Sequence, residues 1–83
     1  MSNSARFVNI GFGSLVNASR IVAVVSSDSA PVKRLLRDAE DRNQLVEATF
    51  GRKARAVLVM DSGHVVRCAL QTETLASRLE EEA

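Results

Sequence analysis

The stretch that decides the fold is LVEATFGRKARAVLVMDSGHVVRCAL, residues 45–70. Apolar and polar residues alternate over residues 45–50, and apolar residues dominate residues 54–60 and 64–70, a pattern typical of β-strands. Gly51 and the Asp-Ser-Gly sequence of residues 61–63 separate these strands with residues that favour turns. We therefore predict a β-meander in this half of the chain.

A short helix should follow the meander. Thr72 is a candidate N-cap, and apolar residues recur at helical spacing after it. The glutamates at positions 80–82 oppose the helix dipole, so we expect this end to fray. The apolar stripe consists of Leu75, Ala76 and Leu79.

Two strands and a helix should precede the meander. Residues 6–13 form a short strand pattern that ends in glycines, and residues 21–25 are apolar on both faces of a second strand. Pro31 suits the first turn of a helix capped by Asp28 or Ser29. Asn43 is a plausible helix stop. The helix presents one apolar stripe, formed by Val32, Leu35, Leu36 and Ala39.

The order β-β-α-β-β-β-α over one domain, residues 1–83, predicts an α+β fold. We expect a mostly antiparallel sheet of four to five strands with two helices on one face. The opposite face would then carry charged residues together with valines, including Val57, Val59 and Val65. Those valines are either ordinary exposed side chains or the contact with another subunit.

Composition excludes several classes of protein. Cys68 is the only cysteine, so no disulfide forms within the chain, and one Cys with one His cannot build a structural zinc site. The apolar run of residues 21–25 is too short to span a bilayer. We expect a cytoplasmic protein that, at 83 residues, gains stability by self-association.

No catalytic arrangement is evident. Asp61, Ser62 and His64 lie in one turn, which cannot readily supply a converging triad with an oxyanion site. Cys68 falls on the predicted core face. The GFGS sequence of residues 11–14 lacks the third glycine of a phosphate-binding loop. We predict no enzyme activity, no cofactor, no metal site and no small-molecule substrate.

Cations concentrate at one turn. Arg52, Lys53 and Arg55 follow Gly51, which lets the tip of the turn stand clear of the sheet. Guanidinium groups match phosphate geometry, and the same tip repeated around an oligomer would meet many phosphates at once. The alternative is a polar tip that only guards a sheet edge against aggregation.

Four pieces of the sequence, FVNIGFG, SRIVAVVS, SAPVKRL and ATFGRKARAV, together resemble the RemA family of bacterial regulators, which activate extracellular-matrix (biofilm) genes. The resemblance runs from about residue 7 to the last helix and leaves out the acidic tail. It implies a nucleoid-associated, DNA-binding transcription factor without a helix-turn-helix. It also implies a ring-shaped homo-oligomer, for which an octamer is one candidate size.

The resemblance also implies site residues. Arg52 and Lys53 match two adjacent arginines that contact DNA in the family, and the lysine keeps the charge without the planar fork. Arg20 matches a further arginine tied to DNA binding, and Pro31 matches the helix-start proline. With Arg55, these cations form the predicted DNA-binding set.

Two rivals stay open: a ring that binds RNA, and a scaffold whose cations meet an acidic protein. Only Phe7, Phe12 and Phe50 are aromatic. We expect the chain to lack exposed rings for stacking single-stranded bases, so the sequence favours double-stranded DNA.

Overall fold

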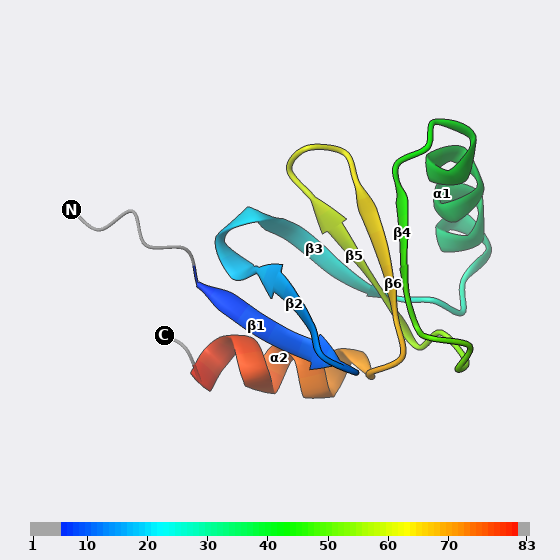
Figure 1. The fold of residues 1–83 in the computed structure, drawn as a ribbon. Helices are drawn as coiled ribbons and strands as arrows, with labels where there is room; N and C mark the ends of the chain where they lie inside the picture. Colours follow the sequence, from blue (N-terminus) through cyan, green and yellow to red (C-terminus); the bar gives the residue numbers. More distant parts are fainter. Residues whose placement is uncertain (1–5, 82–83) are drawn as a thin grey trace.

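The structure is a computed structural model that describes residues 6–81. The elements follow the predicted order (Figure 1), so the α+β fold class is confirmed, and a short 3₁₀ turn links β2 to β3. Their bounds are β1 Phe7–Gly11, β2 Ser14–Asn17, the 3₁₀ turn Ala18–Arg20, β3 Ile21–Ser26, α1 Ala30–Asp41, β4 Leu45–Ala48, β5 Ala56–Met60, β6 Val65–Cys68 and α2 Thr72–Glu81.

The strands form two sheets. β1 and β2 make an antiparallel hairpin, and the other four strands lie in the order β3-β5-β6-β4. The predicted β-meander is wrong at one strand, because β4 pairs in parallel with β6 and not with β5. The reason is that β3 and β6 already occupy both edges of β5. Residues 49–55 therefore cross the end of β6, and Cys68 lies opposite both Ala48 and Ala56.

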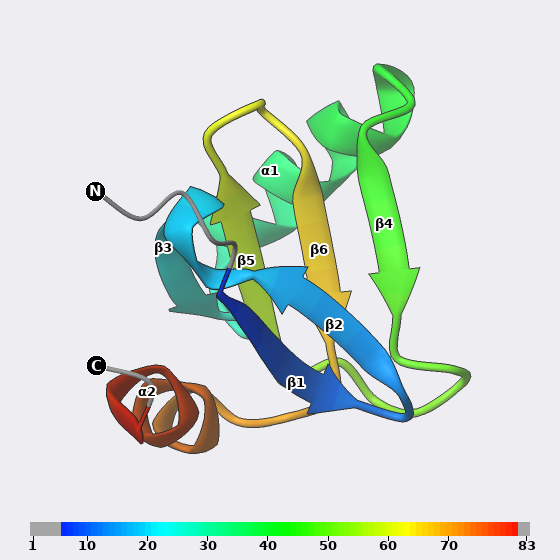
Figure 2. The same ribbon diagram turned by 60° about the vertical axis from the view of Figure 1, so that its left-hand side comes forward.

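The two helices cover opposite faces of the four-stranded sheet, which corrects the expectation that both lie on one face (Figures 1 and 2). α1 packs over Val57 and Val65, whereas α2 and the β1–β2 hairpin pack over Leu58 and Val66. The physical reason is that β5 is apolar on both sides, so each face of the sheet needs a cover.

This arrangement overturns one interpretation of the valine-bearing face. Val57 and Val65 are 0% and 1% exposed beneath α1. They are therefore part of the core within one chain and do not form the contact with another subunit. Val59, on the same face, is only partly buried.

The start of α1 follows the sequence signals. Ser29 is the N-cap, and its Oγ accepts a hydrogen bond from the Val32 backbone N–H at 3.3 Å. Pro31 lies in the first turn, and Asn43 takes a left-handed conformation, with φ 58°, just beyond the end of the helix.

α2 begins at Thr72 itself, so Thr72 is the first helical residue and not the cap. Of the predicted acidic tail, Glu82 lies outside the described residues.

Candidate nucleic-acid interface

The basic loop begins with a tight turn at Phe50 and Gly51. Both residues have positive φ, 51° and 82°, and the Arg52 N–H donates to the Thr49 carbonyl oxygen at 3.0 Å. Two central residues with positive φ are the mark of a type I′ turn, whose first central position favours Asn, Asp or Gly. A left-handed conformation costs a residue with a Cβ roughly 1–2 kcal/mol. Phenylalanine at this position is therefore an unfavourable choice for the turn alone.

The tip of the β1–β2 hairpin repeats this feature. Gly11 pairs with Ser14 across the hairpin, which leaves Phe12 and Gly13 as its two-residue loop. Their φ values are 58° and 81°. The GFGS sequence is thus a hairpin tip and not a phosphate-binding loop. A Phe-Gly pair in left-handed conformation occurs at both turns.

The fold brings the two Phe-Gly turns together. The ring centroids of Phe12 and Phe50 lie 5.8 Å apart at an interplanar angle of 52°. The Arg52 guanidinium carbon lies 5.1 Å from the centroid of the Phe12 ring, within the range of a cation–π interaction. We call Phe12, Phe50, Arg52, Lys53 and Arg55 the aromatic–basic cluster.

The three cations of the cluster are exposed. Arg52, Lys53 and Arg55 make no ion pair within residues 6–81. Arg55 lies directly before β5 and not inside the strand as predicted, although its backbone N–H still donates to the Cys68 carbonyl oxygen at 2.8 Å. All three cations also line a shallow cavity of ≈ 230 Å³, together with Phe12, Ala69 and Leu70.

A second hollow lies between the basic loop and the start of α1. Its volume is ≈ 440 Å³, and its charged lining residues are Arg52, Lys53, Lys33, Arg67 and the acidic Asp28. Arg67 pairs with Glu47 at 3.0 Å, whereas Lys33 makes no ion pair among the residues the structure describes. Four cations and one carboxylate line this hollow, so a net positive charge extends from the cluster towards α1.

Arg20 does not join the cluster. Ile21 pairs with Met60 and Ser26 pairs with Ala56, so Arg20 and Arg55 lie at opposite ends of the β3–β5 pair. The Arg20 guanidinium forms an ion pair with the Asp61 carboxylate at 3.1 Å. The predicted DNA-binding set is therefore divided into a group of three cations and a separate, paired arginine.

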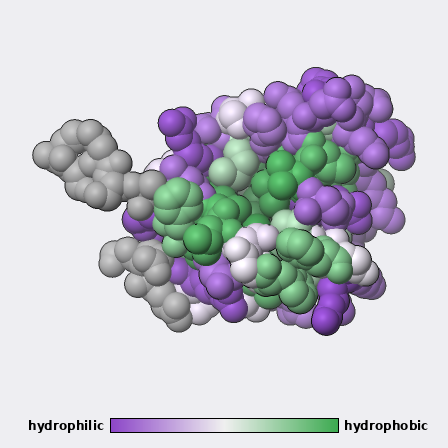
Figure 3. Space-filling model, in the orientation of Figure 1, coloured by the Kyte–Doolittle hydropathy of each residue, from purple (hydrophilic) through white to green (hydrophobic). Residues whose placement is uncertain are grey.

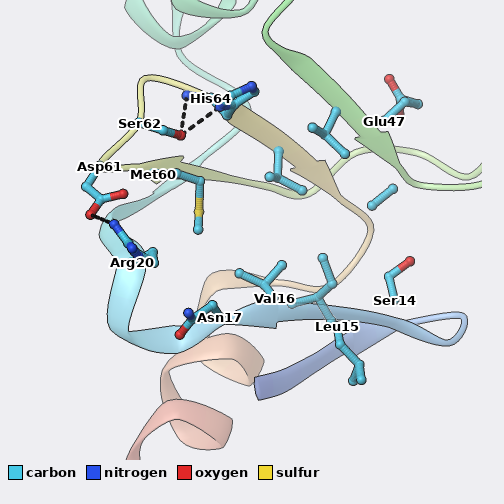
Figure 4. A pocket seen from close by; sticks show the side chains of 14 residues that line it. Ser14, Leu15, Val16, Asn17, Arg20, Glu47, Met60, Asp61, Ser62 and His64 are labelled. Atoms are coloured by element: carbon cyan, nitrogen blue, oxygen red, sulfur yellow. Dashed lines mark hydrogen bonds and ion pairs between the residues drawn. The ribbon is translucent and has the colours of Figure 1, made fainter. Parts of the chain in front are cut away.

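Arg20 lies instead at one end of a groove between the β1–β2 hairpin and the four-stranded sheet. The groove has a volume of ≈ 550 Å³, and its wall includes the side chains of Val16, Val46 and Met60. Figure 4 shows polar residues at both ends, with Val16 and Met60 between them. Figure 3 shows the apolar band that runs across this side of the molecule.

The groove contains no converging catalytic triad. The Ser62 hydroxyl lies 2.7 Å from His64 Nδ1, but the Asp61 carboxylate is turned to Arg20 (Figure 4). Within residues 6–81, no three His, Cys, Asp or Glu side chains lie close enough together to hold a metal ion.

Cys68 is a core residue, as predicted. It is fully buried, and its thiol donates to the Ile10 carbonyl oxygen at 3.4 Å. Burial raises the pKa of the Cys68 thiol, which keeps it protonated and unreactive.

Among the described residues, no helix is both long and apolar enough to cross a membrane.

Sequence reasoning missed the exposure of the aromatic residues. Phe7, Phe12 and Phe50 are 55%, 49% and 64% exposed, so the expectation that the chain lacks exposed rings is wrong. The usable signal was the repeated Phe-Gly dipeptide, since glycine at the second position permits the left-handed turn. What the sequence does not show is that the two turns meet.

Comparison with known proteins places the chain in a family. Residues 7–79 match the family model RemA-like, described as extracellular matrix regulatory protein A-like. A relative from Dictyoglomus thermophilum is 63% identical over 75 residues, which cover 90% of this chain and 88% of the relative. A relative from Brevibacillus brevis is 55% identical over 74 residues, which cover 89% of this chain and 86% of the relative.

A cyanobacterial relative, from a Nostoc species, is 55% identical over 73 residues, which cover 88% of this chain and 83% of the relative. The names of all three relatives begin "Putative regulatory protein". The family match spans nearly all of the chain that the structure describes. This protein belongs to the RemA-like family of regulatory proteins.

Proposed function

We propose that this protein is a DNA-binding transcriptional regulator that acts as a ring-shaped homo-oligomer. In this proposal, the aromatic–basic cluster of each subunit faces the phosphate backbone of the double helix. The observation that carries the proposal is the group of three exposed cations, Arg52, Lys53 and Arg55, which have no carboxylate partner among the described residues. The description of the family suggests extracellular-matrix genes as targets.

The chemistry of the cluster suits phosphate. Arginine offers a planar fork that can donate two hydrogen bonds to one phosphate, and lysine adds a compact charge. Without acidic partners, these groups lose little when they turn towards DNA. Binding should then release counterions and depend steeply on salt concentration.

One cluster on a 9.0 kDa chain would bind DNA only weakly, so the proposal includes self-association. We infer that a second copy of the chain occupies the apolar groove. Val46 is 45% exposed in its wall, and β4 is an edge strand whose outer side has no partner strand in the four-stranded sheet. A head-to-tail contact of this kind closes into a ring when its rotation permits.

Arg20 has a different part in this proposal. Its ion pair with Asp61 lies at the end of the groove, away from the cluster. We infer that Arg20 supports DNA binding through assembly, by shaping the surface that receives the neighbouring subunit.

The test is duplex DNA binding by an Arg52→Ala, Lys53→Ala double variant whose assembly state has been checked by light scattering. Exposed turn residues change folding stability by only about 0.5 kcal/mol or less, so the variant should fold and assemble normally. Affinity should fall at least tenfold. The slope of log affinity against log salt should become shallower by about one unit for each phosphate contact removed.

An Arg34→Ala, Arg37→Ala double variant is the matched control, because it removes two exposed cations from α1 without touching the cluster. It should keep nearly all of the affinity. If the cluster variant keeps both its affinity and its salt slope, the DNA-binding surface lies elsewhere on the chain.

A ring that binds RNA is the second candidate, and the exposed rings of Phe12 and Phe50 favour it more than the sequence indicated. Aromatic side chains stack on unpaired bases, which single-stranded RNA offers freely. Competition between duplex DNA and single-stranded RNA of equal length separates the two candidates. If RNA competes more strongly than DNA, RNA is the ligand. If the protein binds neither, the remaining hypothesis is a scaffold whose cations contact an acidic protein.

A further inference from the structure

We propose that Phe50 is an apolar wedge that enters a base step of the bound double helix, and that Phe12 is its support. This inference rests on the proposed DNA-binding function and adds a contact with the bases to the contacts with phosphate. It also gives a role to the two Phe-Gly turns, because the binding of phosphate by the cations does not require a phenylalanine at either turn.

The first reason is the cost of the arrangement. Phe12 and Phe50 each occupy the first central position of a turn with positive φ, where Asn or Gly fits better. Both side chains nevertheless remain about half or more exposed, so burial in the core does not compensate for the conformation. Backbone outliers of this kind cluster at functional sites.

The second reason is the geometry of the two rings. At 5.8 Å and 52°, they touch each other at an angle, so no base can lie between them. Arg52 lies over the Phe12 ring. Phe50 is the more exposed ring of the pair, at 64%, and it is braced from one side by Phe12. The pair therefore presents one exposed ring, Phe50, that is supported by the Phe12 ring.

The third reason is the charge around the rings. The cavity beside Phe12 is lined by Arg52, Lys53 and Arg55, and none of its described lining residues is acidic. A partner surface of protein would have to be strongly acidic to approach here. In nucleic acid, negatively charged phosphates lie next to flat, apolar bases. This arrangement is complementary to cations that lie next to an exposed ring.

A wedge has a preferred substrate. Apolar side chains that enter DNA do so from the minor groove, where they unstack a base step and kink the helix. Pyrimidine–purine steps such as TA and CA open most easily, and arginine is attracted to a narrow minor groove. We therefore infer that each cluster favours a flexible step flanked by a narrow groove, without reading a longer base sequence.

The experiment uses the assembled protein with duplexes that carry either one central TA step or a continuous A-tract. Phe50→Asn removes the ring and suits the left-handed turn, Phe50→Tyr keeps a ring, and Phe7→Asn is the control for losing an exposed phenylalanine elsewhere. Three quantities are measured: affinity at several salt concentrations, bending by energy transfer between the duplex ends, and fluorescence of 2-aminopurine placed at the TA step.

With the wild type, the fluorescence at the TA step and the bend should both rise on binding. Phe50→Asn should abolish both changes and weaken binding to the TA duplex by about tenfold, the loss typical of one stacking contact. Its salt slope should stay unchanged, because no charge is removed. Phe50→Tyr and Phe7→Asn should behave like the wild type.

The outcomes separate this inference from the proposed function. If Phe50→Asn keeps the affinity, bend and fluorescence change, the wedge is refuted, while a loss of salt slope in the Arg52→Ala, Lys53→Ala variant would still support phosphate binding. If Phe50→Asn breaks the oligomer, Phe50 belongs to a subunit contact and the wedge is also refuted. If neither variant changes DNA binding, the proposed interface itself is wrong.

Discussion

At the scale of single residues, the structure separates cations that look alike in the sequence. Arg52 and Lys53 project from a turn, and no acidic partner for either occurs within residues 6–81. Arg20 is held by Asp61 at 3.1 Å, at the other end of the β3–β5 pair. Arginine therefore occurs in two settings on this fold: Arg52 has no carboxylate partner among the described residues, and Arg20 is ion-paired.

If Arg20 supports assembly through its ion pair, the two partners of the Arg20–Asp61 pair should give the same result when either is removed. If Arg20 acts through assembly, Arg20→Ala and Asp61→Ala should both reduce the size of the particle measured by light scattering. The free energy of unfolding should change by about 1 kcal/mol or less, since both side chains are well exposed. If Arg20 instead contacts phosphate, Asp61→Ala would leave assembly intact and strengthen DNA binding by freeing the guanidinium.

At the scale of elements, the two helices have different neighbours. α1 closes the core around Val57 and Val65, and α2 closes the other core with the β1–β2 hairpin. The sequence located both helices, because their apolar stripes and the Ser29 cap are local signals. It could not assign their faces, because the sheet they cover is assembled from strands distant in the chain.

The arrangement predicts that only the inner side of each helix is sensitive to size. Ala39→Leu should lower the free energy of unfolding by about 1–3 kcal/mol, because Ala39 is fully buried against the sheet and leaves no room for a larger side chain. The matched change on an exposed position of α2, Ala76→Leu, should alter it by about 0.5 kcal/mol or less. Urea unfolding followed by circular dichroism measures both. Equal effects would mean that α1 does not pack as described.

At the scale of the whole molecule, two surfaces share one small domain. The aromatic–basic cluster lies where β4 ends and β5 begins, and the apolar groove lies between the hairpin and the sheet. In the proposed ring, a second copy in the groove would leave the cluster free to face DNA. Repetition of the cluster around a ring would then turn weak contacts into a stable complex.

The proposed assembly predicts that a charge in the groove weakens DNA binding even when that charge is positive. Val46→Lys places a lysine on an edge strand, where lysine is well tolerated, so the chain should still fold. The particle should shrink towards the 9.0 kDa monomer, and duplex affinity should fall at least tenfold. Ala76→Lys adds the same charge outside the groove and should change neither property. An intact oligomer in Val46→Lys would place the subunit contact on another surface.

The sequence by itself determined the element types and their order, since strand alternation, helix stripes, caps and turn glycines act between residues close in the chain. It also located the basic loop, because Arg52, Lys53 and Arg55 are near neighbours in sequence. Only the tertiary structure decided that β4 pairs with β6, that the helices take opposite faces, and that Phe12 meets Phe50. Those outcomes depend on which strands occupy the two edges of β5 and on the need to bury both of its faces. Strands distant in the chain compete for these positions, and this competition leaves no local pattern in the sequence.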